Sequence, residues 1–267
     1  MHEFLDITAK SQSQAPTENQ VNNSSFFHGK FRKYSSKLDG VGYILKVEQA
    51  EYPELPAMEF LCNKIYDILH IPIPDYYLIR FPENQACFVT KNFMHDLVAS
   101  TLDHIYHFVK PGMPYDCETL ITIIGDQTGR RSEQEKLAYL TLADSLIGNH
   151  DRHGRNLGFI RSTRGISLAP FYDNPSAIGI EDASFLGADL QPKGTIYTKA
   201  SQEPSMRDYI KEWQRLGYGE VISQFQHDIQ TVNLDNVIQA SFLSDRRKNA
   251  LMRLITKRKQ ELCEILK

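Results

Sequence analysis

A polar loop between two apolar segments is the feature that most constrains this chain. Residues 131–147 carry apolar side chains at helical spacing, and every residue of the following segment, 148–156, is polar, charged or glycine. The chain then turns apolar, and residues 160–166 are typical of a β-hairpin. A hairpin brings the chain back to where it started. We therefore expect Asn156, which precedes it, and Asp173, which follows it, to lie near each other.

The residue types at these positions suit phosphoryl transfer. Magnesium prefers oxygen ligands, which the Asn156 carboxamide and the Asp173 carboxylate supply. Asp151 lies five residues before Asn156, where a carboxylate can orient an attacking hydroxyl and accept its proton. Protein kinases have the same order of catalytic Asp, Asn and metal-binding Asp. The pattern predicts that Asp151 is catalytic and that Asn156 and Asp173 bind Mg²⁺ beside ATP.

Simpler interpretations exist for the same residues. Asp151 also suits the cap of a turn after a helix, and Asp173, which is followed by Asn-Pro, suits an Asx-turn. A metal site on His150 and His153 is another alternative, although no further His or Cys stands at ligand spacing. The role that we expect for His153 is to shape the loop by hydrogen bonding.

The rest of the sequence divides into a β-rich part and a helical part. Residues 1–25 are mostly polar and predict a flexible arm. Residues 26–92 predict a small lobe of strands with one helix, and residues 93–267 predict a larger helical lobe. The expected fold is α+β and bilobal, of the protein-kinase type, with a cleft between the lobes. We expect strands at residues 41–46, 76–81 and 86–90, and helices at residues 57–70, 131–147, 205–217, 219–231 and 245–266.

One lysine in the small lobe is placed to meet phosphates. Lys46 ends the expected strand 41–46 in an otherwise apolar stretch, where a cleft-facing ammonium acts as a point charge. Its partner would be a carboxylate on the next helix, either Glu59, which we favour, or Glu54. The alternative is an exposed edge-strand lysine that blocks aggregation.

Two further segments of this lobe are candidates for ATP contacts. Gly29 and Lys33 belong to a basic segment whose amides and charges could contact phosphates, although no GxGxxG or Walker A pattern is present. Lys91, Asn92 and Phe93 join the two lobes, and such a connector can offer backbone groups to an adenine ring. Taken alone, the basic segment is better explained as an ordinary basic hairpin. A plain linker explains the connector as well as an adenine contact does.

Composition excludes some function classes. Apolar residues make up 41% and charged residues 24% of the chain, as in ordinary soluble domains, and no apolar run has the length of a membrane helix. The net charge of −3 gives no reason to expect direct nucleic-acid binding. No secretory signal is visible, and the four scattered cysteines suit a reducing cytoplasm. We expect a cytoplasmic protein, with export to another cell left open.

Four stretches together resemble the HipA-type toxin kinases over residues 26–235. They are YILK at residues 43–46, YPELP at 52–56, DRHGRN at 151–156 and LAPFYD at 168–173. The resemblance is closest to the short HipT branch, which lacks the additional N-terminal subdomain of the longer HipA chains. It implies a serine/threonine kinase toxin of a bacterial toxin–antitoxin system. In that branch the partners are a small HipS protein and a DNA-binding HipB protein.

The resemblance also implies a substrate class and residue roles. Such kinases inhibit translation by phosphorylating an aminoacyl-tRNA synthetase, which is the tryptophanyl enzyme for HipT. By carry-over, Asp151 accepts the proton, Asn156 and Asp173 hold magnesium, and Lys46 binds the ATP phosphates. The other ATP-binding positions that it implies are Gly29, Lys33, Lys91, Asn92, Phe93, His153 and Tyr172.

The phosphate loop departs from the family pattern. Gly29 and Lys33 fit, but Phe26 and Phe31 stand where a serine and a glutamine are expected. The family regulates itself by phosphorylating a serine in this loop. The nearby candidates for autophosphorylation are Ser24, Ser25, Ser35 and Ser36.

Other functions compete with the toxin kinase. An Asp-Arg-His-x-x-Asn loop also resembles phosphoinositide kinases, and small-molecule kinases use related loops. A pseudokinase or binding module would be expected to lack Lys46, Asp151, Asn156 or Asp173, and all four are present.

Overall fold

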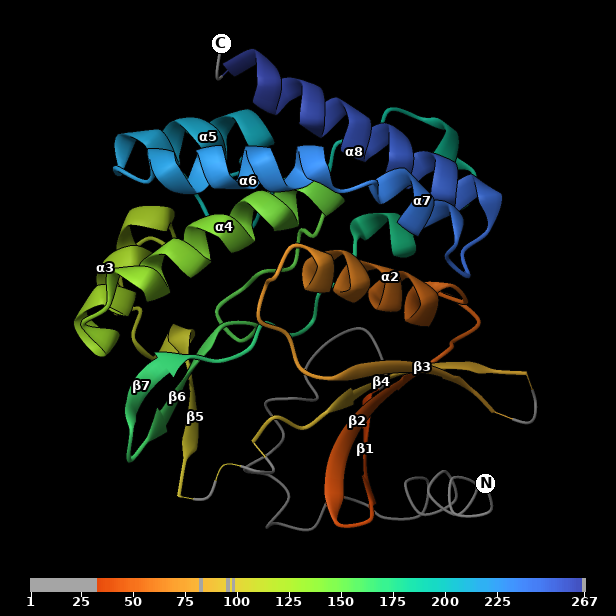
Figure 1. Cartoon of the computed structure of the whole chain (residues 1–267), viewed down its shortest axis with the longest axis horizontal. Helices are drawn as coiled ribbons and strands as arrows, with labels where there is room; N and C mark the ends of the chain where they lie inside the picture. Colours follow the sequence, from red (N-terminus) through yellow and green to blue (C-terminus); the bar gives the residue numbers. More distant parts are fainter. Residues whose placement is uncertain (1–32, 82–83, 95–96, 98, 266–267) are drawn as a thin grey trace.

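The computed structural model describes residues 33–81, 84–94, 97 and 99–265. It consists of a four-stranded antiparallel sheet, with a mostly helical part beside it that carries a second, three-stranded sheet (Figure 1). This confirms the expected α+β class. The expected arm at residues 1–25 lies outside the described residues.

The four-stranded sheet has the order β1-β2-β4-β3. Its strands are β1 (Lys33–Leu38), β2 (Val41–Val47), β3 (Tyr76–Arg80) and β4 (Ala86–Lys91). Leu45, Cys87 and Val89 form a small apolar cluster on this sheet. The register places Lys33 of β1 directly opposite Lys46 of β2. Two like charges face each other across the strands, which is unfavourable unless an anion lies between them.

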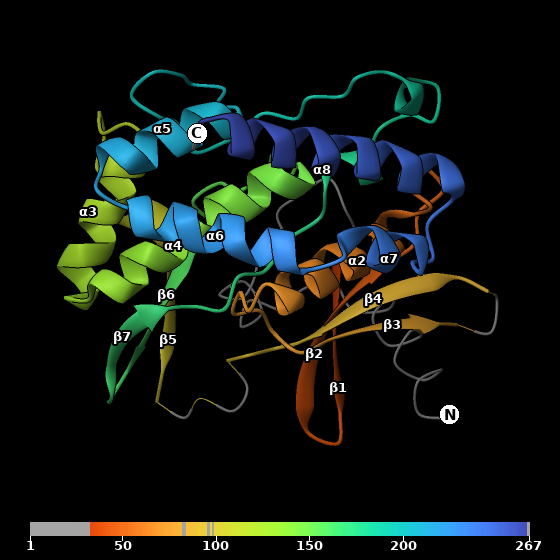
Figure 2. The same cartoon turned by 45° about the horizontal axis from the view of Figure 1, so that its top comes forward.

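Helix α2 (Leu55–Ile68) lies between this sheet and the helices of the larger part (Figures 1 and 2). It begins two residues before the expected start, because Pro56 is accommodated in its first turn, where no backbone N–H is needed. Buried Met58, Leu61 and Ile65 form its apolar stripe. The buried Glu59 stands beside this stripe, which brings a carboxylate into the interior.

Helix α4 (Arg131–Ile147) is the central helix of the larger part, and four others pack around it (Figure 2). They are α3 (Cys117–Thr128), α5 (Met206–Arg215), α6 (Gly219–Thr231) and α8 (Asp245–Ile265), whereas α7 (Leu234–Gln239) packs against α8 and α2. The periodicity correctly predicted α4 and α6, and it predicted α5 and α8 to within two residues at each end. It missed α3 and α7. None of the described helices has the length and apolar character needed to span a membrane.

The second sheet contains the expected hairpin and one strand more. Strands β6 (Gly158–Ser162) and β7 (Gly165–Leu168) form the hairpin, and β5 (Thr101–His104) pairs with β6 on its other side. The loop 148–157 is therefore fixed at both ends, by α4 before it and by the sheet after it.

Candidate active site

A pocket lies where the four-stranded sheet, α2 and the loop after α4 meet. It has about 640 Å³ of space, including space open to solvent. The sheet and α2 contribute Lys33, Ile44, Lys46, Thr90, Lys91, Glu59 and Asn63 to its lining. The rest of the chain contributes Pro74, Phe93, His104, His153, Arg155, Asn156, Tyr172 and Asp173.

One carboxylate joins the two facing lysines of the sheet. Asp173 accepts hydrogen bonds from Lys33 through Oδ2 and from Lys46 through Oδ1. Lys46 also donates to Glu59, the helix residue that the sequence suggested as its partner. The other suggested partner, Glu54, does not approach Lys46, because it accepts hydrogen bonds from Ser244 and Arg247 instead. Three segments far apart in the sequence thus meet in one charged cluster.

Charge and burial act against each other in this cluster. Burial alone would raise the pKa of Asp173, but Lys46 and Lys33 outweigh it and hold the pKa well below its usual value. Burial likewise opposes the charge of Lys46, yet Asp173 and Glu59 raise its pKa. Burial raises the pKa of Glu59, and Lys46 offsets this only in part, because the nearby charge of Asp173 also raises it. The second oxygen of Glu59, Oε2, is buried without a hydrogen-bond partner among the described residues.

Asp173 has an unusual backbone conformation. Its φ is 56°, in the left-handed region, which Asp tolerates better than most residues. Such a residue needs support from its surroundings, and left-handed non-glycine residues are common at ligand sites. The conformation agrees with a carboxylate that is placed for binding.

The loop after α4 holds Asp151 and Asn156 together. The Asn156 side-chain amide donates to the Asp151 carbonyl over 2.8 Å, which leaves its own carbonyl oxygen as the atom suited to bind a cation. The Asp151 N–H donates to Asn149 Oδ1 over 3.0 Å. The Asp151 carboxylate itself lies outside the pocket lining and is 64% exposed. A catalytic base for a bulky substrate would be expected at such an open position.

Two histidines belong to this loop, His150 and His153. His153 Nδ1 accepts a hydrogen bond from the Arg155 N–H over 3.2 Å, and His153 Nε2 lies 3.7 Å from an Asp151 carboxylate oxygen. His150 accepts a hydrogen bond from the Thr195 hydroxyl through its carbonyl. In the part of the chain that the structure describes, no group of three or more His, Cys, Asp or Glu residues is arranged around a common metal position.

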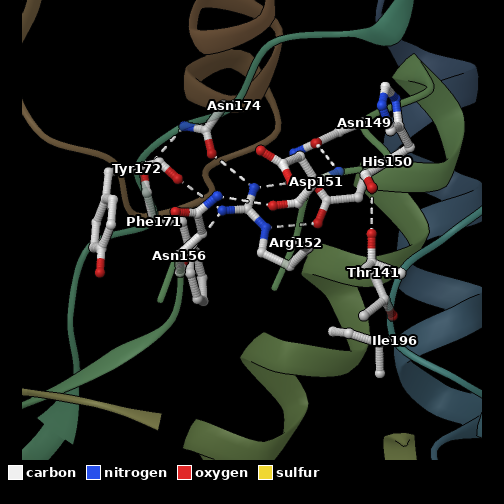
Figure 3. A network of polar contacts seen from close by, with 12 residues as sticks. Thr141, Asn149, His150, Asp151, Arg152, Asn156, Phe171, Tyr172, Asn174 and Ile196 are labelled. Carbon is white, nitrogen blue, oxygen red and sulfur yellow. Dashed lines mark hydrogen bonds and ion pairs between the residues drawn. The ribbon is translucent and has the colours of Figure 1, made fainter. Parts of the chain in front are cut away.

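Arg152 ties the loop to the interior and was not expected from the sequence. Its guanidinium is buried and binds both carboxylate oxygens of Asp144 over 2.9 Å. It also donates to the carbonyls of Tyr172 and Asn156 and to the side chain of Asn174 (Figure 3). Burial opposes its charge, but Asp144 raises the pKa of Arg152, so the guanidinium stays charged. One side chain thus links the segments that carry Asn156 and Asp173.

An aromatic group closes another side of the pocket. The rings of Phe93 and Tyr172 are stacked with centroids 5.7 Å apart. The Tyr172 hydroxyl donates to the Arg155 carbonyl and contacts His104 Nδ1. Flat apolar surfaces of this kind suit a heteroaromatic ring such as adenine.

Some of the expected ATP contacts and autophosphorylation sites lie elsewhere in the structure or outside the described residues. Gly29, Ser24 and Ser25 lie outside the described residues. Ser35 and Ser36 lie within β1, where they are paired with Ile44 and Tyr43. Of the connector, Lys91 and Phe93 line the pocket, whereas Asn92 donates its N–H to the Gly42 carbonyl.

The sequence carried a weak signal for the residues that were missed. Asp144, Asn63 and Tyr66 are polar groups on the buried faces of amphipathic helices, where a polar side chain needs a partner. Tyr66 and Asn149 both donate to Asp144, which confirms that these helices share a polar core. The identity of each partner could not be predicted from spacing.

The residues of the pocket fit a magnesium–nucleotide complex. Mg²⁺ is usually held by one or two protein oxygens together with substrate phosphates, and Asn156 and Asp173 both present oxygens to the same pocket. Lys33 and Lys46 supply positive charge for phosphates at the same place.

The fold is similar to two solved kinase-related structures. One is the Helicobacter pylori proinflammatory kinase CtkA, with a TM-score of 0.71 and 17% identity over 89% of this chain and 90% of that chain. The other is HipA of Shewanella oneidensis MR-1, with a TM-score of 0.63 and 14% identity over 89% of this chain and 64% of that chain. At these identities the likeness concerns the fold alone. A comparison with curated proteins finds no match.

The Shewanella HipA was solved together with HipB and operator DNA. Our expectation that this chain makes no direct nucleic-acid contact therefore finds no support in that comparison. The sequence itself matches the family model of the HipA-like C-terminal domain over residues 19–235. Because this match spans most of the chain, the protein belongs to the HipA-like C-terminal domain family.

Proposed function

We propose that this protein transfers the γ-phosphate of ATP to serine or threonine residues of a protein, in the presence of Mg²⁺. The observation that carries the proposal is the meeting of Lys46, Asn156 and Asp173 at one pocket, although Lys46 comes from a distant part of the sequence. Family membership and the kinase-like fold support it. We further propose that residues 26–92 and 93–267 act as its two lobes.

Each residue of the pocket has a role in this proposal. Asp151 accepts the proton of the attacking hydroxyl, and its exposed carboxylate favours a macromolecular substrate. Asn156 and Asp173 would hold the magnesium ion, which supplies neutralisation of the phosphate charge when bound. Lys46 and Lys33 bind the phosphates, and Phe93 and Tyr172 contact the adenine.

The contact of Asp173 with both lysines fits a site that is made for an anion. Without a nucleotide, the Asp173 carboxylate lies between two cross-strand lysines that would otherwise repel each other. A phosphate group can take over both lysines and leave Asp173 to a cation. The electrostatic partners are thus exchanged when the nucleotide binds, and none is left unpaired.

The biological role that we propose is that of a toxin kinase of the HipT branch. On this proposal it phosphorylates an aminoacyl-tRNA synthetase, in the first instance the tryptophanyl enzyme, and so inhibits translation in the bacterial cytoplasm. HipS-like and HipB-like proteins would be its antitoxin partners. The Shewanella HipA–HipB structure supports a partnership of this type.

Transfer of labelled phosphate from ATP into a bacterial lysate tests the proposal. We expect one labelled protein, identified by mass spectrometry, and no label after Asp151→Asn. Asp126→Asn, on the exposed face of α3, is the matched control and should remain active. Label in lipids or small molecules instead would favour a phosphoinositide or small-molecule kinase. Full transfer by Asp151→Asn would remove Asp151 from the mechanism.

Expression in bacteria tests the toxin role separately. We expect the wild type to arrest growth and Asp173→Ala to be harmless, since the variant lacks a metal ligand. Equal toxicity of the two proteins would contradict a kinase toxin.

A further inference from the structure

A pair of buried asparagines connects α2 to the segment of Asp173. Asn63 of α2 is 2% exposed and Asn174 is fully buried. The Asn174 side-chain amide donates to Asn63 Oδ1 over 3.0 Å, and the Asn63 side-chain amide donates to the Glu59 carbonyl over 2.8 Å. One side-chain bridge therefore joins the turn of α2 that carries Glu59 to the residue that follows Asp173.

Every polar atom of this bridge is used. Asn174 directs its second amide hydrogen to the Phe171 carbonyl over 3.0 Å, and its Oδ1 accepts from Arg152 over 2.7 Å (Figure 3). Arg152 is itself fixed by both oxygens of Asp144. A buried amide with all partners in place has one orientation, because any rotation leaves donors unpaired. The Asn174 side chain is thus fixed from α2 on one side and from the loop after α4 on the other.

The neighbouring Asp173 has the property that requires such support. Its left-handed backbone, with φ 56°, is retained only when the surroundings enforce it. Its carboxylate also has to leave two lysines and turn to a cation during the proposed reaction. A fixed residue directly after Asp173 limits where its side chain can go.

We propose that Asn63 is a positioning residue for Asp173, acting through Asn174, and that it coordinates the placement of the Lys46–Glu59 pair with that of the metal-binding carboxylate. The inference rests on the proposed phosphotransfer function. Asn63 lines the pocket through its place on α2. Its effect is on the geometry of the site, so that loss of the bridge changes metal-supported nucleotide binding more than it changes the fold.

The test uses the full chain, four variants of the bridge and one control variant. Asn63→Ala and Asn174→Ala each remove one end of the bridge, and the double variant removes both. Asn63→Asp is the conservative variant, because a carboxyl of nearly the same shape can still accept the hydrogen bond from Asn174. Asn233→Ala is the matched control, since this exposed asparagine caps α7 through the Asn236 N–H and is not part of the pocket lining.

Three quantities are measured for each protein. They are the affinity for ADP with and without Mg²⁺ by calorimetry, the Mg²⁺ concentration for half-maximal phosphate transfer, and the Tm. We expect Asn63→Ala to weaken Mg·ADP binding and to raise the half-maximal Mg²⁺ concentration about tenfold, which corresponds to about 1.4 kcal/mol. Metal-free ADP binding should change much less, and Asn63→Asp should restore most of the metal response.

The double variant decides whether Asn63 acts through Asn174. If it does, the double variant is no worse than Asn174→Ala alone, because the bridge is already broken. Losses that add in the double variant would overturn the inference. An Asn63→Ala protein with a lower Tm but the Mg²⁺ response of the wild type would also overturn the inference. If Asn63→Ala does not fold, Asn63→Asp and Asn174→Ala decide by the same Mg²⁺ readout. A wild type that neither transfers phosphate nor binds Mg·ADP would overturn the proposed function itself. An active wild type together with an Asn63→Ala variant of unchanged Mg²⁺ response would overturn only the role of Asn63.

Discussion

Replacing Lys46 by methionine removes the cation that two carboxylates share. Lys46 is 7% exposed and Glu59 is 1% exposed, so water cannot solvate the Glu59 carboxylate once the ammonium is gone. Met occupies a similar length of apolar chain, and the change is therefore mainly electrostatic. The two carboxylates fare differently, since Asp173 keeps Lys33 whereas Glu59 loses its ion-pair partner.

The magnitude follows from the burial of Glu59. Removing one partner of a buried ion pair costs about 3–5 kcal/mol, because a charge is left in the interior without compensation. We expect the lower end, about 3 kcal/mol, since Asp173 remains paired. Replacing both partners, as Lys46→Met with Glu59→Gln, leaves no buried charge on α2 and should recover roughly 2 kcal/mol. Neither protein should transfer phosphate, so stability and activity separate.

The effect also has a pH dependence of defined sign. The pKa of Glu59 is already raised in the folded protein by burial, and loss of Lys46 raises it further. A carboxyl whose pKa is raised in the folded protein contributes fully to the free energy of unfolding below its usual pKa of 4.5. This contribution is lost as the pH rises through the folded-state pKa. The deficit of Lys46→Met should therefore be larger at pH 8 than at pH 5. The double variant should show little of this slope.

Urea unfolding at both pH values measures these free energies for the wild type, Lys46→Met, the double variant and the control Lys37→Met. Lys37 is exposed on β1, so this control should change stability by no more than about 0.5 kcal/mol. A loss below about 1 kcal/mol for Lys46→Met, or a deficit that shrinks at pH 8, would refute the electrostatic reasoning.

Three other perturbations test separate parts of the molecule. Lys46 and Lys33 overcome burial and lower the pKa of Asp173, so its stabilising contribution is present above its usual value of 3.8 and is lost as the pH falls. Urea unfolding between roughly pH 5 and pH 2 should show this loss, and Asp173→Asn should flatten it. Asp144→Asn leaves a buried guanidinium without its carboxylate and should cost about 3–5 kcal/mol in the same assay; a loss below about 1 kcal/mol would contradict a buried ion pair. Gly194→Ala places a Cβ 1.9 Å from the Tyr209 hydroxyl and should cost about 1–3 kcal/mol, whereas Gly187→Ala meets nothing within 4 Å; equal Tm values for these two variants would exclude the clash.

Much of the fold could be predicted because it is encoded locally. The apolar spacing of α4 and α6 and the turn residues of the β6–β7 hairpin are signals within one segment. Helix α3 was missed because its sequence, CETLITIIGDQT, is rich in β-branched residues that disfavour helices. Its Asp116 N-cap, which accepts from the Thr119 N–H, was the signal that could have revealed it.

Strand β5 shows a different limit of sequence reasoning. It has only four residues, and its partner β6 lies more than fifty residues later. No local pattern distinguishes such a strand from a loop, since its conformation comes from pairing with a distant segment.

The sequence by itself determined the chemistry that the chain can offer. The order of Asp151, Asn156 and Asp173 around a predicted hairpin places a carboxylate, an amide and a second carboxylate in a kinase-like series, because spacing along the chain limits where a hairpin can bring them. Only the tertiary structure decided which groups meet. It pairs Lys46 with Glu59 and not with Glu54, because α2 turns Glu59 into the interior while Glu54 binds α8. Such partners depend on burial and on contacts between segments remote in sequence, and the local spacing of residues predicts neither.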